Sequence, residues 1–188
     1  AVKGVVLENG TQLEADCVVL ATGGCSYPLT GSSGDGYRLA ESAGHTVIEP
    51  KASLIPLVED GADCARMQGL ALKNIEIKVR NQKKKVVFQE FGELLFTHFG
   101  LSGPVILSAS AHMRNFEKER YTVSVDLKPA LDEKKLDERI LRDFAENQNR
   151  EFANSLGALL PRLMIPVIVE RTGIAPEKRV HDLTKGER

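Results

Sequence analysis

The chain has 188 residues, 42% of them hydrophobic and 27% charged, and a formal net charge of −1. This composition supplies enough apolar residues for a core, and the near-neutral charge gives no indication of a nucleic-acid partner. No apolar run approaches the ~20 residues that span a bilayer, and the three cysteines lack the spacing of a disulfide framework or zinc site. We therefore expect one or two small cytoplasmic domains with no metal site and no membrane partner.

The first segment predicts short strands. Val2–Leu7 and Thr11–Leu13 flank Glu8-Asn9-Gly10, and Asn-Gly is a strong short-range hairpin signal. Cys17–Leu20 follows as an uninterrupted apolar run, which is typical of a strand buried on both faces. We expect its neighbours in the sheet to be parallel strands from outside this chain, so that the strand edges of residues 1–50 favour self-association.

A glycine-rich loop follows this strand. Ala21–Gly24 are all small, and a second glycine set within Gly31–Gly36 leads into a helix predicted over Tyr37–Ala43 and closed by Gly44. His45–Ile48 is interpreted as a further short strand. A strand, a glycine loop and a helix start present backbone N–H groups to an anion such as a cofactor phosphate. The spacing is neither Gly-x-Gly-x-x-Gly nor a Walker A loop, so a plain flexible connection remains an alternative.

The central part predicts a small antiparallel sheet or partly closed barrel. Ile75, Ile77 and Val79 alternate with polar residues, the pattern of a half-solvated strand. The strand-like segments are Ser53–Val58, Ile75–Val79, Val86–Phe91, Glu93–Thr97 and Tyr121–Leu127. The basic run Lys83–Lys85 is interpreted as a solvated hairpin turn, and Pro104–Arg114 as a helix that begins with proline at its first position.

The last part predicts helices. An apolar stripe with helical spacing is formed by Leu136, Ile140, Leu141 and Phe144. Further helices are predicted within residues 154–163 and 166–171, and Gly173 is a plausible stop. The fold class is therefore α+β.

Two long motifs resemble one known family. They are Ala21-Thr-Gly-Gly-Cys-Ser-Tyr-Pro-Leu-Thr-Gly-Ser-Ser-Gly-Asp-Gly-Tyr37 and Gly92-Glu-Leu-Leu-Phe-Thr-His-Phe-Gly-Leu-Ser-Gly-Pro104. Both are similar to the three-domain bacterial FAD-dependent oxidoreductases that include aminoacetone oxidase. The resemblance implies a partial FAD-binding domain at 1–50, an inserted β-rich substrate domain at 51–128 and a helical bridging part at 129–188. The family's N-terminal Gly-x-Gly-x-x-Gly turn and C-terminal FAD segment do not occur in this sequence, so we expect the chain to be the middle of a longer protein.

The resemblance also implies where FAD is bound. The candidate cofactor-binding residues are Thr22, Gly23, Gly24, Ser26, Gly34 and Asp35. A side chain larger than hydrogen in the Ala-Thr-Gly-Gly turn would collide with the cofactor. A tight turn needed only for packing is the alternative, and Asp35 suits a helix cap better than a place beside a pyrophosphate.

His98 is the candidate catalytic residue. It lies within the second motif, and histidine titrates near neutrality and is able to move a proton to or from a substrate. Its flanking residues Phe96 and Phe99 also fit a packed structural histidine. No two histidines stand four residues apart, so the sequence predicts no metal site.

These observations favour the central fragment of an FAD-dependent oxidoreductase that acts on a small molecule, whether an amine, an amino ketone or an unsaturated ring. We expect the full-length parent to hold FAD and the fragment alone to bind none, because the pyrophosphate-binding turn is not in it. A non-enzymatic binding or interaction module without flavin is the alternative. A phosphate-binding enzyme unrelated to flavin would need cations near Gly31–Gly36, where Arg38 alone is close.

Overall fold

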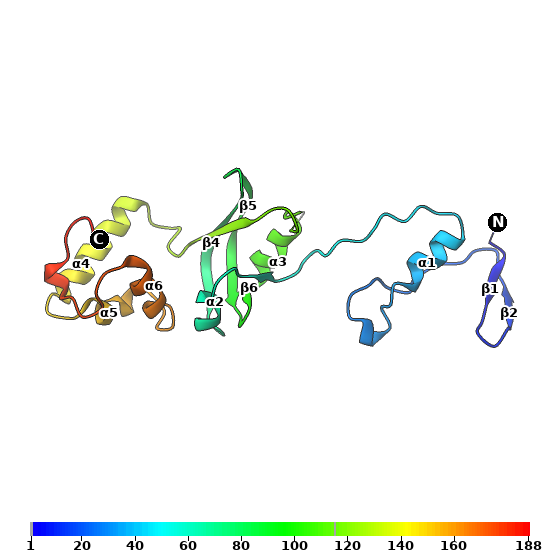
Figure 1. Cartoon of the computed structure of the whole chain (residues 1–188), viewed down its shortest axis with the longest axis horizontal. Helices are drawn as coiled ribbons and strands as arrows, with labels where there is room; N and C mark the ends of the chain where they lie inside the picture. The colour runs from blue at the N-terminus through cyan, green and yellow to red at the C-terminus, as the bar shows by residue number, and fades with distance from the viewer. Residues whose placement is uncertain (1, 115) are drawn as a thin grey trace. The chain divides into compact units, whose positions relative to one another are not determined.

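The computed structural model describes residues 2–114 and 116–188, and the chain divides into two compact units (Figure 1). Unit 1 is Ala1–Lys51 and unit 2 is Ala52–Arg188. Helices and antiparallel sheets occur together, which confirms the α+β class.

Unit 1 contains a hairpin, a loop and one helix. Strands β1 (Gly4–Val6) and β2 (Gln12–Glu14) pair antiparallel, as the Asn-Gly signal predicts. A short 3₁₀ turn, η1 (Pro28–Thr30), precedes helix α1 (Asp35–Ser42). Gly44 follows the helix with φ of 90°, a left-handed conformation that suits the predicted helix stop.

Two strands expected in unit 1 do not form. Cys17–Leu20 and His45–Ile48 are neither helix nor strand, and Val19 is 87% exposed. No strand among the described residues hydrogen-bonds to either segment, and a β-strand exists only through such pairing. The strand interpretation of His45–Ile48 is therefore wrong, whereas that of Cys17–Leu20, whose neighbours are expected outside this chain, stays a prediction.

Unit 2 is built on a five-stranded antiparallel sheet with the order β3-β6-β5-β4-β7, curled as a half-barrel. The strands are β3 (Leu57–Val58), β4 (Ala71–Asn81), β5 (Val86–Phe96), β6 (Gly100–Ser102) and β7 (Tyr121–Asp126). The alternation seen in the sequence holds, because Ile75, Ile77 and Val79 are buried while their neighbours on β4 are not.

The sheet differs from the predicted strands at several positions. Within Ser53–Val58 only Leu57–Val58 forms a strand, β3. Residues 86–97 were expected to form two strands and form the single long strand β5, which passes through Gly92 without a break. Strand β6 was not anticipated, because its three residues are too few to carry a periodic pattern.

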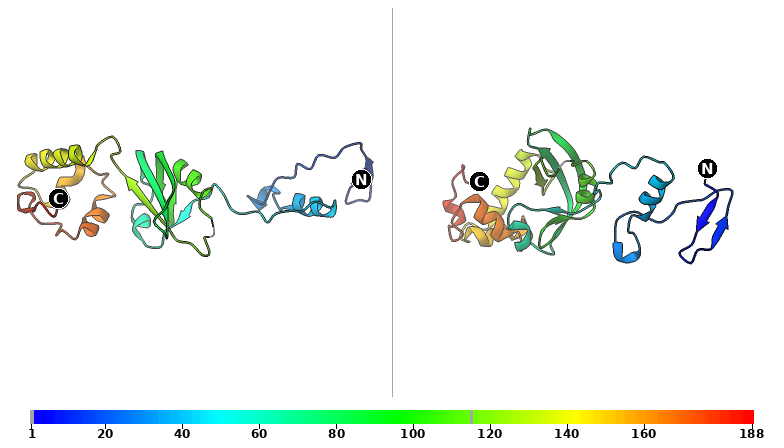
Figure 2. Two further views of the ribbon diagram at one scale, coloured as in Figure 1. Left: turned by 90° about the horizontal axis from the view of Figure 1, so that it is seen from above. Right: turned by 45° about the vertical axis from the view of Figure 1, so that its right-hand side comes forward.

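Helix α3 (Pro104–Ser110) packs on the sheet and begins at the proline as expected, although it ends before Arg114 (Figure 2). Val105 and Ile106 are buried with Ile77 and Leu94 of the sheet in one hydrophobic cluster. The short helix α2 (Asp63–Arg66) contributes Cys64 to the same cluster.

The helical part of unit 2 joins this core through one helix and the segment just before it. Its elements are α4 (Glu133–Glu146), α5 (Phe152–Ser155), η2 (Leu156–Ala158), α6 (Ile165–Thr172) and η3 (Val180–Asp182). Asp132 caps α4 by accepting a hydrogen bond from the backbone of Lys135, and Gly173 ends α6 as predicted. Val167 of α6 belongs to the sheet cluster, whereas Val169 belongs to a second cluster around Phe152.

Two ion pairs connect α6 to α2. Arg66 lies 2.7 Å from Glu170, and Arg171 lies 3.2 Å from Asp63. Because these side chains are substantially exposed, the pairs position the two helices and contribute little stability by themselves. The burial of Val167 and Met164 stabilises this junction more than the ion pairs do, because it removes apolar surface from water.

Candidate functional site

The glycine loop of unit 1 closes on itself. The Gly34 N–H donates a hydrogen bond to the Gly24 carbonyl oxygen over 3.1 Å. At Gly36 a Cβ atom would lie 2.5 Å from Thr22 Oγ1, so a larger residue there would require the Thr22 side chain to move. The structure thus brings Thr22, Gly23 and Gly24 beside the start of α1, where Gly34 and Asp35 lie.

The start of α1 differs from the expectation for Asp35. Gly34 occupies the N-cap position and Asp35 is the first helical residue, so the capping role predicted for Asp35 is wrong. Its carboxylate accepts a hydrogen bond from Ser33 Oγ over 2.8 Å and pairs with Arg38. The hydrogen bond from Arg38, and then that from Ser33, lower the pKa of Asp35 below its usual range.

These contacts decide what the loop is able to hold. Residues 22–24 present backbone and small side chains and fit close contact with a flavin nucleotide. The first turn of α1 fits a pyrophosphate poorly, because the ionised Asp35 would repel it and Arg38 is already paired. The same pairing removes the cation that a flavin-independent phosphate site would have used.

Ser26 lies apart from these contacts. It is exposed and makes no hydrogen bond among the described residues. The next residue, Tyr27, has φ of 56° and is 80% exposed. The roles of Thr22, Gly23, Gly24, Ser26, Gly34 and Asp35 in binding FAD stay predictions.

His98 lies in the turn between β5 and β6. The turn is fixed by Thr97, whose Oγ1 donates to the Gly100 carbonyl over 3.0 Å and accepts from the Gly100 N–H over 3.1 Å. The His98 ring is exposed and meets the Phe99 ring edge-on at a centroid distance of 4.9 Å. No hydrogen-bond partner of the His98 ring occurs within residues 2–114 and 116–188, so the ring is accessible and its catalytic role stays a prediction.

The rest of the second motif serves packing. A Cβ atom at Gly92 would lie 2.5 Å from Val105 Cγ1, so glycine lets α3 approach β5. At Gly100 a Cβ atom would lie 2.1 Å from the Leu57 carbonyl oxygen, so glycine lets β6 approach β3. This motif therefore holds the half-barrel together and places the His98 turn at its edge.

Sequence reasoning missed a cavity in the helical part of unit 2. It has a volume of about 530 Å³ and lies between the end of β7 and helices α4, α5 and α6. Its apolar lining residues are Val125, Leu127, Leu136, Ile140, Phe144, Phe152, Leu156, Leu159, Leu160 and Ile168. The sequence signal for it is the wide apolar stripe of α4, which predicts a helix but does not indicate a cavity beside it.

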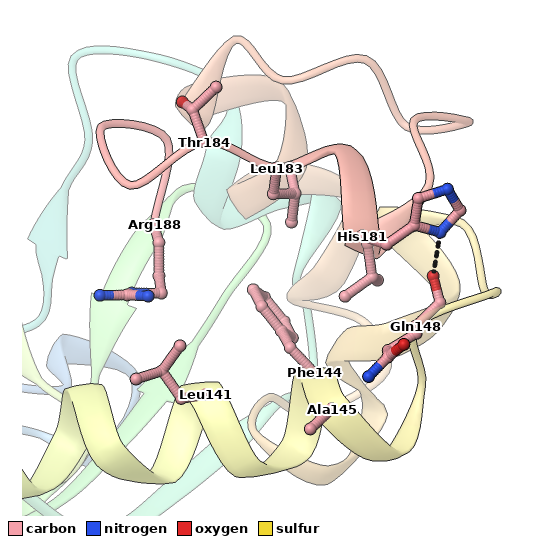
Figure 3. A pocket seen from close by; sticks show the side chains of 9 residues that line it. Leu141, Phe144, Ala145, Gln148, His181, Leu183, Thr184 and Arg188 are labelled. Carbon is pink, nitrogen blue, oxygen red and sulfur yellow. Dashed lines mark hydrogen bonds between the residues drawn. The ribbon is translucent and has the colours of Figure 1, made fainter.

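A second hollow of about 380 Å³ shares Phe144 and Arg188 with this cavity. Figure 3 shows Leu141, Phe144 and Ala145 of α4 on one side of it, with His181 and Leu183 on the other. His181 Nδ1 lies 2.8 Å from the carbonyl oxygen of Gln148, which is the dashed contact in Figure 3. Neither cavity contains a residue predicted to bind cofactor or act in catalysis.

Within residues 2–114 and 116–188, no group of three or more His, Cys, Asp or Glu side chains is placed to bind a metal ion. No helix in the same ranges is long and apolar enough to cross a membrane.

Along the chain, the glycine-rich loop of unit 1 is followed by a half-barrel joined to a helical part. Residues 51–188 match the family described as "HI0933-like protein barrel and H2TH domain", and the chain belongs to this family. The family is related to the FAD-dependent oxidoreductases, in agreement with the resemblance found in the two motifs.

Three curated relatives extend the similarity into unit 1. The chain is 30% identical over 186 residues to a ribosomal RNA dihydrouridine synthase of Haemophilus influenzae, covering 98% of this chain and 43% of that protein. It is 32% identical over 157 residues to the protein of the same name from Escherichia coli, with coverage of 84% and 37%. It is 27% identical over 176 residues to a 3-dehydro-bile acid delta(4,6)-reductase of Clostridium scindens, with coverage of 92% and 42%. The chain thus spans about two fifths of the length of these relatives.

Proposed function

We propose that this chain is the central part of an FAD-dependent reductase that saturates an activated carbon–carbon double bond in a ring. The observation that carries the proposal is the similarity over 98% of the chain to a ribosomal RNA dihydrouridine synthase. Dihydrouridine is uridine with its ring double bond reduced, and the name delta(4,6)-reductase likewise denotes reduction of ring double bonds. Of the substrates considered from the sequence, this chemistry favours the unsaturated ring.

The proposal assigns separate tasks to the two units. When bound, reduced FAD supplies the hydride, and the Thr22–Gly24 turn contacts the cofactor without a large side chain in the way. Unit 2 supplies the surface that holds the substrate. His98, exposed in the turn after β5, is the group that delivers a proton to the second carbon of the double bond.

The exposed apolar run of unit 1 supports this assignment. Val18, Val19 and Leu20 are 41%, 87% and 45% exposed, although such a run is typical of a strand buried on both faces. A flavin domain completed by other strands would cover them. The alternative of a self-standing module without flavin is less well supported, because it gives no reason for an apolar run or for relatives that match both units.

The first test is the visible absorption spectrum of the full-length protein, with this chain alone as the control. Oxidised flavin absorbs at about 450 nm, and we expect that band in the full-length protein only. The variant Gly23→Val should lose the band while unit 2 remains folded by circular dichroism. A colourless full-length protein would refute the proposal, and normal flavin content in Gly23→Val would remove Gly23 from the cofactor site.

The second test concerns the reaction. The reduced full-length protein is mixed without oxygen with either a uridine-containing RNA or an unsaturated ketosteroid, and reoxidation of the flavin is followed. Faster reoxidation with one substrate class identifies the double bond that accepts the hydride. His98→Gln should slow this step and change its pH profile, whereas His112→Gln is a matched control. If neither class accelerates reoxidation, the chain's reductase assignment fails.

A further inference from the structure

One end of the sheet in unit 2 collects basic side chains from two separate segments. The hairpin between β4 and β5 carries three consecutive lysines, and the β4–β7 register pairs Asn81 with Tyr121. This pairing brings the segment before Tyr121 to the same end as the hairpin. We call the following residues the basic end: Arg80, Lys83, Lys84, Lys85, Arg114, Lys118 and Arg120.

The charges of the basic end are not neutralised by ion pairs. Among the residues that the structure describes, no carboxylate oxygen lies within 4.0 Å of a charged nitrogen of these seven side chains. All except Arg80 are exposed. The two acidic residues in the same segments are Glu117 and Glu119. The whole-chain charge of −1, which gave no indication of nucleic acid, therefore conceals a strongly positive local surface.

The lysine turn is also held in a defined shape. Asn81 Oδ1 accepts hydrogen bonds from the backbone N–H groups of Lys83 and Lys85, each over 3.1 Å. The Asn81 N–H donates to the Lys85 carbonyl over 3.0 Å. Lys84 adopts φ of 60°, a left-handed conformation in which glycine or asparagine would be less strained. These hydrogen bonds hold the three lysines in one turn at the end of the sheet.

An aromatic ring accompanies these cations. Phe116 is 42% exposed, and its ring packs beside Tyr121 with centroids 5.8 Å apart. Tyr121 is fixed in turn, because its hydroxyl donates to the Arg114 carbonyl over 2.6 Å and accepts from the Arg114 N–H over 3.0 Å. An exposed aromatic ring near exposed cations is an arrangement on which single-stranded bases stack.

We propose that the basic end binds the phosphate backbone of single-stranded RNA, with Phe116 as a stacking platform for a base. The inference rests on the proposed function for the view that the RNA carries the ring to be reduced. RNA is favoured over an anionic lipid surface because a lysine turn held by hydrogen bonds and an exposed aromatic ring lie at the same end of the sheet. Interfacial lipid binding uses an amphipathic helix with a broad apolar face, and the basic end is not helical.

The test measures binding of the 188-residue chain to a fluorescent single-stranded RNA oligonucleotide by anisotropy, across a range of salt concentrations. Each phosphate contact contributes roughly −0.7 to the slope of log affinity against log salt for single strands. If about five cations engage, affinity should fall about 100-fold between roughly 50 and 200 mM salt. The triple variant K83Q/K84Q/K85Q should bind at least about tenfold more weakly and reduce the slope by about 2.

A matched control variant removes three positive charges from the helical part of unit 2 instead of from the lysine turn. Lys134, Lys135 and Lys185 are exposed in the helical part, and K134Q/K135Q/K185Q should bind RNA as the unaltered chain does. Equal loss in both triple variants would show that net charge alone attracts RNA and would overturn the proposal. So would absence of RNA binding at low salt, or binding to vesicles that contain phosphatidylserine without binding to RNA.

The RNA-binding test and the flavin test of the proposed function give results that can be told apart. Both triple variants leave the Thr22–Gly24 turn intact, so flavin content of the full-length protein should not change. Flavin without RNA binding would overturn the inference alone. RNA binding in a colourless full-length protein would keep the basic end and refute the reductase.

Discussion

The contact between Gly92 and Val105 gives a quantitative test of how the half-barrel is packed. In Gly92→Ala the new methyl group would lie 2.5 Å from Val105 Cγ1, and Val105 is 2% exposed. Ordinary carbon–carbon contacts are about 3.5–4.0 Å, so helix α3 must shift by about 1 Å. Overpacking of this kind costs about 1–3 kcal/mol, and alanine recovers about 0.5–1 kcal/mol of strand propensity. We expect a net destabilisation of about 1–2 kcal/mol.

A double-mutant cycle isolates the contact. Val105→Ala removes two methyl groups at about 0.8 kcal/mol each, so it should cost at least about 1.6 kcal/mol. In Gly92→Ala/Val105→Ala the clash is absent, and the double variant should be no less stable than Val105→Ala alone. The coupling energy should therefore be about −1 to −2 kcal/mol.

Urea unfolding followed by circular dichroism measures all three variants. Gly157→Ala is the control, because a Cβ atom there would meet nothing within 4 Å and the residue is exposed. It should be neutral or slightly stabilising. Additivity within about 0.5 kcal/mol would refute the clash, as would a Gly92→Ala variant that behaves like Gly157→Ala.

Three further predictions concern single side chains. Cys64 is 5% exposed, and its burial, followed by its hydrogen bond with Glu59, raises the pKa of its thiol to about 12. A thiol reagent at neutral pH should therefore modify only the exposed Cys17 and Cys25 until the chain is unfolded. Lys84→Gly should relieve the left-handed strain and stabilise unit 2 by about 1 kcal/mol in urea unfolding, while weakening RNA binding. The hydrogen bond from Lys178 lowers the pKa of Glu187 to about 2. Because the folded pKa lies below the unfolded value, this contact stabilises the fold above about pH 4.5, and the stabilisation is lost as the pH falls towards 2. The NMR shift of the Glu187 carboxyl carbon, measured against pH, gives the folded pKa. A midpoint near 4.5 would contradict the contact.

Local patterns were sufficient where a segment's structure depends on its own residues. The alternation of Ile75, Ile77 and Val79 predicted β4, and the stripe of apolar residues predicted α4. Pro104 and Gly173 marked a helix start and a helix stop, because their backbone preferences act at the residue itself. Such signals need no knowledge of what the segment packs against.

Local patterns failed where the outcome depends on a distant partner. Gly92 suggested a break between two strands, yet β5 continues through it because the glycine makes room for α3. Cys17–Leu20 has strand-like composition and no strand beside it among the described residues. Asp35 was expected at the helix cap, but Ser33 and Arg38 hold its carboxylate within the first turn.

The motif residues and the basic end differ in the same way, because the former follow from local sequence and the latter depends on distant partners. The glycine turn at Thr22–Gly24 and the histidine at position 98 were found from motifs, and the structure shows that several glycines in those motifs are explained by packing within the fold. A motif shared with relatives thus supports a common architecture more directly than a common substrate. The basic end was not visible as a motif, because Arg114, Lys118 and Arg120 join the lysine turn only through the β4–β7 register. Under the proposed function, substrate preference is therefore to be sought in surfaces that the fold assembles, and the lysine turn is where binding should separate RNA from a small apolar ring.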